Sequence, residues 1–370
     1  MIRKTLLLLL LLCFPITGGC WDQSALKDKR IINGASFDVS DNDPDLILGA
    51  IRTIQLQSKG GSELEIKDNL IKGETKTVGE LHTDLQNKVS GKMDVGKAFI
   101  IIVGEELAMK KDLTSIIEPV YRSSKGYIAS KMVLSKGKGF DLLNIDEQQK
   151  SPIAFEILRL LEGSEDETNA PLENTFTVMN KLADKEEDIM LPILESQEEN
   201  QIQIAGAALF NGEKYSGIYL TVDQIPLLLF MKDELQKRSK IHIETEEFPQ
   251  PFSIEIQNVK RAFDVKLNKN NKIQCEIQVT LNAKVTSYYN DGGAIDVEQL
   301  TDIASKALTD RAKTTIGMLQ EANSDVLGIE KVIKTQYPEY WKEQNWDNVF
   351  EHITINPKMK VDIFSTYGIN

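Results

Sequence analysis

The chain has 370 residues, of which 41% are hydrophobic and 27% are charged. This composition is typical of a soluble globular protein, and the length is sufficient for two or three domains of about 100–200 residues each. The formal net charge of -13 argues against nucleic acid as a partner, because the phosphate backbone would repel an acidic protein.

The N-terminus has the layout of a secretory signal peptide. Two basic residues precede an apolar run over 6–14, and two glycines stand directly before Cys20. This ending resembles a bacterial lipoprotein signal, in which the cysteine thiol takes a diacylglyceryl group and the cysteine becomes the mature N-terminus. Thr17 stands where such signals usually carry Leu. We therefore expect residues 1–19 to be a signal peptide and Cys20 to be a lipidation site.

Two alternatives are open for this segment: an ordinary secreted protein that is cut nearby, and a transmembrane anchor. The apolar run is too short to cross a hydrocarbon core of about 30 Å. A later apolar run at 225–231 is shorter still and contains Pro226. Cys13 would leave with the signal and Cys20 would be acylated, so only Cys275 would be left. No intramolecular disulfide could then form.

The N-terminal half is predicted to combine strands and helices in one layered fold. Strands are expected at 30–38, 46–57, 98–103 and 127–134, of which 98–103 is a continuous apolar run typical of a buried strand. Helices are expected at 78–89, 104–120 and from 151 to about 161. Strands that alternate with helices at this spacing predict a mixed α/β architecture.

An acidic stretch at 162–200 separates the two halves of the chain, and 195–200 contains no apolar residue. We place a domain boundary there. Residues 20–198 are then an N-terminal mixed α/β region of one or two subdomains, and residues 201–370 are a C-terminal α/β domain.

The C-terminal half has clearer patterns. Two apolar segments flank Asn211-Gly212, which predicts a β-hairpin over 201–222. Apolar and polar residues alternate over 273–285, which predicts a long half-buried strand with Cys275 on its core side, where it is a packing residue rather than a nucleophile. An apolar stripe predicts a helix over 296–322, about 40 Å long at about 1.5 Å per residue. The last strand includes Val361. The expected fold class is α+β or mixed α/β, with several domains.

Motifs for catalysis, cofactors and metals are weak throughout the chain. The three histidines are His82, His242 and His352, and none of them stands in a spacing typical of metal ligands. Gly137-Lys-Gly139 begins like a dinucleotide fingerprint, but Leu142 replaces the third glycine. We predict no catalytic residue, no cofactor and no metal site.

An acidic loop resembles the start of a calcium loop. Asp41, Asp43 and Asp45 stand at alternate positions, but Leu46 and Arg52 occupy the places that require Gly and Glu. A solvated hairpin loop is the favoured interpretation.

One surface feature supports a separate hypothesis. No acid lies between Glu118 and Asp141, a stretch with five basic residues: Arg122, Lys125, Lys131, Lys136 and Lys138. Such a patch could contact anionic lipid or an acidic partner. The alternative is an exposed sheet edge that lysine protects from strand addition.

Several motifs along the whole chain have the order and spacing of one known family. They are Gly19-Cys20-Trp21-Asp22, the strand at 31–38 ending in Asp, Ile102-Val-Gly-Glu-Glu-Leu-Ala108, Ala205-Gly-Ala-Ala-Leu-Phe210, Tyr215-Ser-Gly217, Asn323-Ser-Asp-Val-Leu-Gly328, Tyr337-Pro338, Tyr340-Trp341 and Gly368. With these residues the chain resembles the Ger(x)C lipoproteins, the C subunits of spore germinant receptors.

The resemblance implies a body of mixed sheets with flanking helices and no catalytic activity. It implies a lipoprotein on the outer face of the inner spore membrane, anchored through Cys20. Its implied partners are a polytopic A subunit and an integral-membrane B subunit, and nutrients would trigger germination through this complex. The alternative function is an extracytoplasmic substrate-binding lipoprotein that partners a membrane transporter, which would need a ligand cleft between domains.

Overall fold

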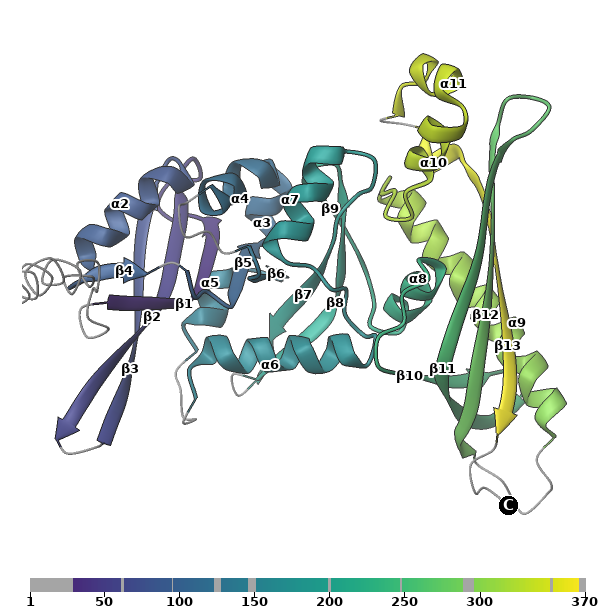
Figure 1. Cartoon of the computed structure of the whole chain (residues 1–370), viewed down its shortest axis with the longest axis horizontal. Helices are drawn as coiled ribbons and strands as arrows, with labels where there is room; N and C mark the ends of the chain where they lie inside the picture. Colours follow the sequence, from purple (N-terminus) through teal and green to yellow (C-terminus); the bar gives the residue numbers. More distant parts are fainter. Residues whose placement is uncertain are drawn as a thin grey trace, which may run out of the picture.

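The computed structural model describes residues 29–60, 63–94, 96–122, 128–145, 151–198, 201–246, 248–288, 296–346 and 349–365. Two β-sheets with packed helices lie at opposite ends of an elongated molecule (Figure 1). The predicted fold class of mixed sheets, flanking helices and a long C-terminal helix is confirmed. In the part of the chain that the structure describes, no helix has the length and hydropathy needed to span a membrane.

The larger sheet has the strand order β3-β2-β1-β5-β6-β7-β8-β9, and β4 (Lys92–Asp94) pairs with the start of β1. Four parallel strands form its centre: β1 (Lys29–Val39), β5 (Ile100–Gly104), β6 (Lys131–Ser135) and β7 (Met190–Ser196). Antiparallel strands extend it on both sides: β2 (Ile47–Gly60), β3 (Glu63–Thr75), β8 (Ile202–Asn211) and β9 (Lys214–Leu220).

Helices cover both faces of the parallel centre. On one face lie α2 (Val78–Lys88), α3 (Glu105–Lys110), α4 (Leu113–Tyr121) and α7 (Thr175–Asp184), and on the other lie α5 (Gly139–Leu143) and α6 (Ile153–Asp166). Ile101 and Val103 of β5 pack in the first core, and Ile100 and Ile102 pack in the second. The apolar run at 98–103 therefore predicted the buried strand correctly, because a strand covered on both faces needs apolar residues at every position.

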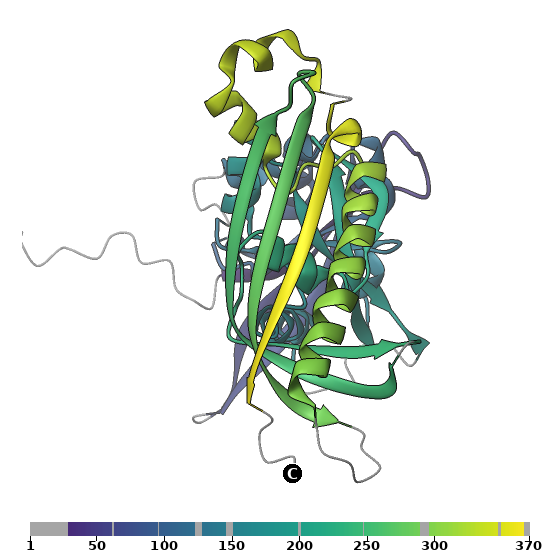
Figure 2. The same ribbon diagram turned by 90° about the vertical axis from the view of Figure 1, so that its right-hand side faces the viewer.

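The smaller sheet has the order β10-β11-β12-β13. Its strands are β10 (Ser239–Thr245), β11 (Phe248–Leu267), β12 (Ile273–Tyr288) and β13 (Thr354–Ser365), and β13 runs parallel to β12. The helix α9 (Val297–Glu321) lies along β13 (Figure 2). Beyond it follow α10 (Ile329–Gln336), α11 (Pro338–Glu343) and a short 3-10 helix at Phe350–His352.

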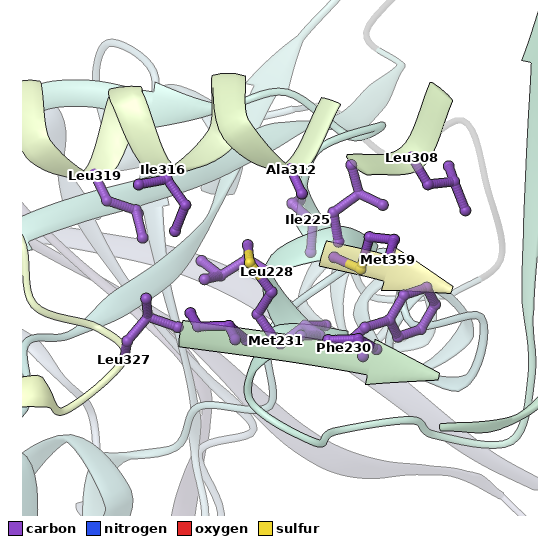
Figure 3. Close-up of a cluster of buried hydrophobic side chains, with 14 of the residues drawn as sticks. Ile225, Leu228, Phe230, Met231, Leu308, Ala312, Ile316, Leu319, Leu327 and Met359 are labelled. Carbon is purple, nitrogen blue, oxygen red and sulfur yellow. The ribbon is translucent and has the colours of Figure 1, made fainter. Parts of the chain in front are cut away.

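A single apolar core joins α9 to the short helix α8 (Ile225–Met231). Side chains of α9 that face α8 in Figure 3 are Leu308, Ala312, Ile316 and Leu319. Every residue of α8 is buried, and Cys275 of β12 is fully buried in the same core. The predictions of the long amphipathic helix and of a core-facing Cys275 are confirmed.

This C-terminal core extends into the larger sheet. Leu209 of β8 and Leu220 of β9 pack in it together with α8. The predicted domain boundary between 198 and 201 falls between β7 and β8, which are hydrogen-bonded neighbours in the larger sheet. Strands on both sides of that boundary thus share one sheet, and the domain division stays a prediction.

Candidate functional site

Cys20 lies outside the described residues, as does Lys125 of the basic stretch. The lipidation of Cys20 therefore stays a prediction. The other cysteine of interest, Cys275, is fully buried in β12. Burial raises the pKa of its thiol to about 12, so at neutral pH it is a packing residue rather than a thiolate nucleophile.

The three histidines lie far apart in the fold. His82 belongs to α2, His242 to β10 and His352 to the short 3-10 helix, and all three side chains are exposed. Among the described residues, no group of three or more His, Cys, Asp or Glu side chains is placed to hold a metal ion.

The acidic loop with alternating aspartates connects β1 to β2, which pair as a hairpin. The Asp43 side chain accepts a hydrogen bond from the Asp45 N–H at 2.9 Å, and the Asp43 carbonyl accepts one from the Leu46 N–H at 3.0 Å. Asp41 forms an ion pair with Lys138. These carboxylates stabilise their own turn and a neighbouring loop.

The basic stretch is not an exposed sheet edge. Its strand, β6, lies between β5 and β7 in the larger sheet, so the sheet-edge alternative is wrong. Sequence could not show this, because the flanking strands come from distant segments. Each described basic residue also has a carboxylate partner; the pairs are Arg122 with Glu118, Lys131 with Glu165, Lys136 with Glu195 and Lys138 with Asp41. In the described part, the positive charge of this stretch is therefore locally balanced.

The glycine turn that resembles a dinucleotide fingerprint follows β6 and opens α5, where such a loop would bind phosphate. A carboxylate of the chain itself occupies this position. Asp38, at the end of β1, accepts hydrogen bonds from the N–H groups of Gly139 at 2.7 Å and Phe140 at 2.8 Å. A Cβ at Gly104 would lie 2.2 Å from Asp38 Oδ1, so glycine is required there. The turn is closed by protein groups rather than open to a nucleotide.

A pocket of about 470 Å³ lies where the two halves of the molecule meet, and we call it the junction pocket. Its walls come from α7 and the segment before it, from β7, from the end of α8, and from β11. The charged side chains that line it are Glu173, Lys181, Glu187, Lys232, Glu234 and Arg261.

Most of these charges form one chain of ion pairs across the junction. Lys181 Nζ lies 2.6 Å from a Glu173 oxygen and 3.1 Å from a Glu187 oxygen. Lys232 Nζ lies 2.7 Å from the same Glu187 oxygen and donates to the Val326 carbonyl at 2.9 Å. Burial opposes the charge on Glu187, but Lys232 and Lys181 outweigh it and lower the pKa of that carboxyl. The Glu187 carboxyl therefore stays ionised at neutral pH.

Beside the junction pocket, two aspartates hold the segment before α10 against the larger sheet. The Asp188 carboxylate accepts from the N–H groups of Gly212 and Asp325, both at 2.7 Å. The Asp325 carboxylate in turn accepts from the N–H groups of Ile329 at 2.9 Å and Glu330 at 2.7 Å. Burial raises the pKa of Asp325 to about 7, although both backbone donors favour its charged form. The Asp188 carboxylate thus connects the segment just before β7 and the β8–β9 turn to the segment before α10, and the Asp325 carboxylate caps the first turn of α10.

Sequence patterns did not reveal the junction pocket. Its charged residues come from three separate segments, 173–187, 232–234 and 261. No motif spacing connects them, because only the packing of α7, α8 and β11 brings them together. The family-like segment 323–328 was the one local signal, and it contains Asp325 and Val326 beside this region.

Comparison with known proteins gives consistent matches for both halves. A family model described as the N-terminal domain of a spore germination protein matches residues 22–196. A second model, described as the C-terminal domain of spore germination B3/GerAC-like proteins, matches residues 205–367. No curated protein matches the sequence.

A solved structure shares the fold. The crystal structure of the GerBC protein aligns with a TM-score of 0.59 at 15% identity, over 93% of this chain and 100% of that chain. Two matched domain models in consecutive order, together with a similar solved fold, agree with the family motifs found in the sequence. The chain belongs to the Ger(x)C family of spore germination proteins.

Proposed function

We propose that the chain is the C subunit of a nutrient germinant receptor, a non-catalytic protein that is required for spore germination. The observation that carries this proposal is the consecutive match of both spore germination domain models, over 22–196 and 205–367. The structural similarity to GerBC supports it with a shared fold.

In this proposal, a lipid on Cys20 anchors the body to the outer face of the inner spore membrane, where its partners are the integral-membrane A and B subunits. The supporting sequence feature is the signal-like segment that ends at Cys20. The connection from Cys20 to Lys29, where β1 begins, can span at most about 30 Å. The folded body would therefore stay close to the membrane surface and to membrane-embedded partners.

The non-catalytic role is supported by how the junction uses its carboxylates. Asp188 and Asp325 each accept two backbone N–H bonds. Glu187 is held between Lys181 and Lys232. In these contacts the three carboxylates serve the packing of the chain itself, which is a structural role.

A second candidate is a substrate-binding lipoprotein that serves a membrane transporter. The junction pocket is the specific observation that favours it, because ligand sites commonly lie between domains. The two candidates differ in what deletion of the gene would remove. A receptor subunit predicts loss of nutrient-triggered germination, and a transporter-linked binding protein predicts loss of solute uptake.

The test is nutrient-triggered germination of spores that carry Cys20→Ala, with Cys13→Ala as the matched control in the same signal segment. Spores with Cys20→Ala should lose membrane retention of the protein and the nutrient response, measured as dipicolinate release. Cys13→Ala and a non-nutrient trigger should leave germination intact. If Cys20→Ala spores respond fully, the anchor is dispensable. If deletion of the gene leaves every nutrient response unchanged, the receptor role is wrong.

A further inference from the structure

The charges of the junction pocket are not equally satisfied by protein partners. Glu173, Lys181, Glu187 and Lys232 are paired at 3.1 Å or less. Arg261 and Glu234 line the same pocket, but their charges are less well matched by protein partners.

Arg261 has no carboxylate partner in the described parts of the chain. One of its terminal nitrogens donates to the Met231 carbonyl at 3.0 Å, and its guanidinium carbon lies 4.7 Å from the centre of the Phe263 ring. A guanidinium carries five N–H donors in a planar fork that matches a carboxylate. Its further donor capacity suits an anionic group that enters the pocket.

Glu234 has the complementary property. Its nearest cation is Lys232 Nζ at 3.7 Å, and that lysine is already closer to Glu187. Burial raises the pKa of Glu234, and Lys232 offsets this only in part. A second cation beside Glu234 would favour its charged form. Glu234 therefore suits a cationic group.

Part of the remaining lining is apolar, and Thr177 and Gln236 add uncharged polar groups. Leu172, Leu229, Val326 and Leu327 line the pocket together with Met190. The volume of about 470 Å³ lies within the range of roughly 300–1,000 Å³ that is usual for small-molecule sites. The lining carries three carboxylates and three cations, so its formal charge is zero. A ligand with a net charge would add an uncompensated charge to the pocket, whereas a ligand of zero net charge would not.

We propose that the junction pocket binds a small zwitterion, with its carboxylate on Arg261, its ammonium on Glu234 and an apolar group against the leucines. This inference concerns the chemistry of the pocket and goes beyond the proposed receptor role. Because the pocket is built from both halves of the molecule, a bound zwitterion would also strengthen their contact.

The test is calorimetric titration of the full chain, purified in detergent, at neutral pH. The probes are L-alanine, L-leucine and L-phenylalanine, which share one zwitterionic group and differ in apolar size. Isocaproate lacks the ammonium of leucine and isoamylamine lacks its carboxylate. We expect at least one of the three amino acids to bind. If leucine binds, isocaproate and isoamylamine should each bind at least about tenfold more weakly than leucine. Absence of binding by all three amino acids at millimolar concentration overturns the proposal.

Variants assign the binding to this site. Arg261→Gln and Glu234→Gln should each weaken binding of the amino acid by about tenfold or more. The matched controls are Arg238→Gln, whose side chain pairs with Glu167 outside the pocket, and Glu244→Gln on the exposed face of β10. Glu234→Gln removes only a 3.7 Å ion pair, so it tests the site even if Arg261→Gln fails to fold. Equal binding by Glu234→Gln and wild type would place the ligand elsewhere and contradict the proposal.

Discussion

At the scale of single residues, buried carboxylates cap the first turns of helices in this protein. Asp38 accepts from the first N–H groups of α5, and Asp325 accepts from those of α10. The first N–H groups of a helix have no partner within it, so such capping avoids unpaired buried donors. Asp38 comes from a strand 101 residues before its helix partner, and no local capping pattern could predict that contact.

The raised pKa of Asp325 makes a prediction about stability and pH. Its folded pKa of about 7 exceeds the unfolded value of about 3.9. The folded chain therefore keeps a proton that the unfolded chain releases, and the contribution of this group to stability decreases as pH rises from about 4 to about 7. Asp325→Asn cannot titrate and should flatten this part of the profile. Urea denaturation at several pH values measures it, with the exposed Asp310→Asn as control. A wild-type slope in Asp325→Asn would contradict the assignment.

At the scale of elements, α9 protects the outer edge of the smaller sheet. The Val361 N–H of β13 donates to Ser305 Oγ at 2.9 Å, and the Met359 N–H donates to Thr309 Oγ1 at 3.0 Å. An uncovered edge strand would present these N–H groups to another chain. Hydroxyl groups of α9 therefore take the place of a further strand.

Removing one of these hydroxyls should loosen β13 without changing the shape of the core. Thr309→Val keeps the volume of the side chain but leaves the Met359 N–H without its acceptor. We expect faster hydrogen–deuterium exchange over residues 354–365. The matched control is Thr314→Val on the same helix, whose hydroxyl bonds only to the Asp310 carbonyl at 3.2 Å. Equal exchange in wild type and Thr309→Val would show that α9 does not protect this edge.

The sequence predicts elements that have a strong local pattern, but it does not predict which elements lie next to one another in the fold. The alternation in β12, the stripe on α9 and the Asn211-Gly212 turn each reflect the burial or backbone shape of one segment. The place of β6 in the sheet depends on β5 and β7, which belong to other segments. Lys131 of β6 suggested a sheet edge, because its acidic partner Glu165 is distant in sequence.

At the scale of the whole molecule, the two halves are joined by three kinds of contact. The C-terminal core takes side chains from the larger sheet, and the ion pairs of the junction pocket cross between the halves. The third contact is the pair of aspartates, in which Asp188 binds the N–H of Asp325. These contacts hold the segments before and after residues 198–201 in one continuous packing arrangement.

Asp188→Ala should weaken this connection. It would leave the N–H groups of Gly212 and Asp325 without their acceptor. Asp325 is buried, whereas Gly212 is exposed, and an unpaired buried donor costs about 1–3 kcal/mol, so we expect the free energy of unfolding to fall by about 1–3 kcal/mol. Chemical denaturation measures the change. The exposed Asp184→Ala, four residues earlier, should change stability by less than about 0.5 kcal/mol. Equal stability of the two variants would mean that the Asp188 contact is not needed.

The parallel pairing of β12 with β13 determines the order in which the smaller sheet can be completed. Residues 289–353 separate the two strands, whereas the β8–β9 hairpin closes through two residues. A hairpin forms in about 1–10 μs, but a contact across a long segment first has to overcome the entropy of closing a large loop. Met359 and Val361, both buried, arrive only with β13. During refolding, the hairpin of the larger sheet should therefore form early, and the smaller sheet should stay open along β12 until residues 354–365 dock.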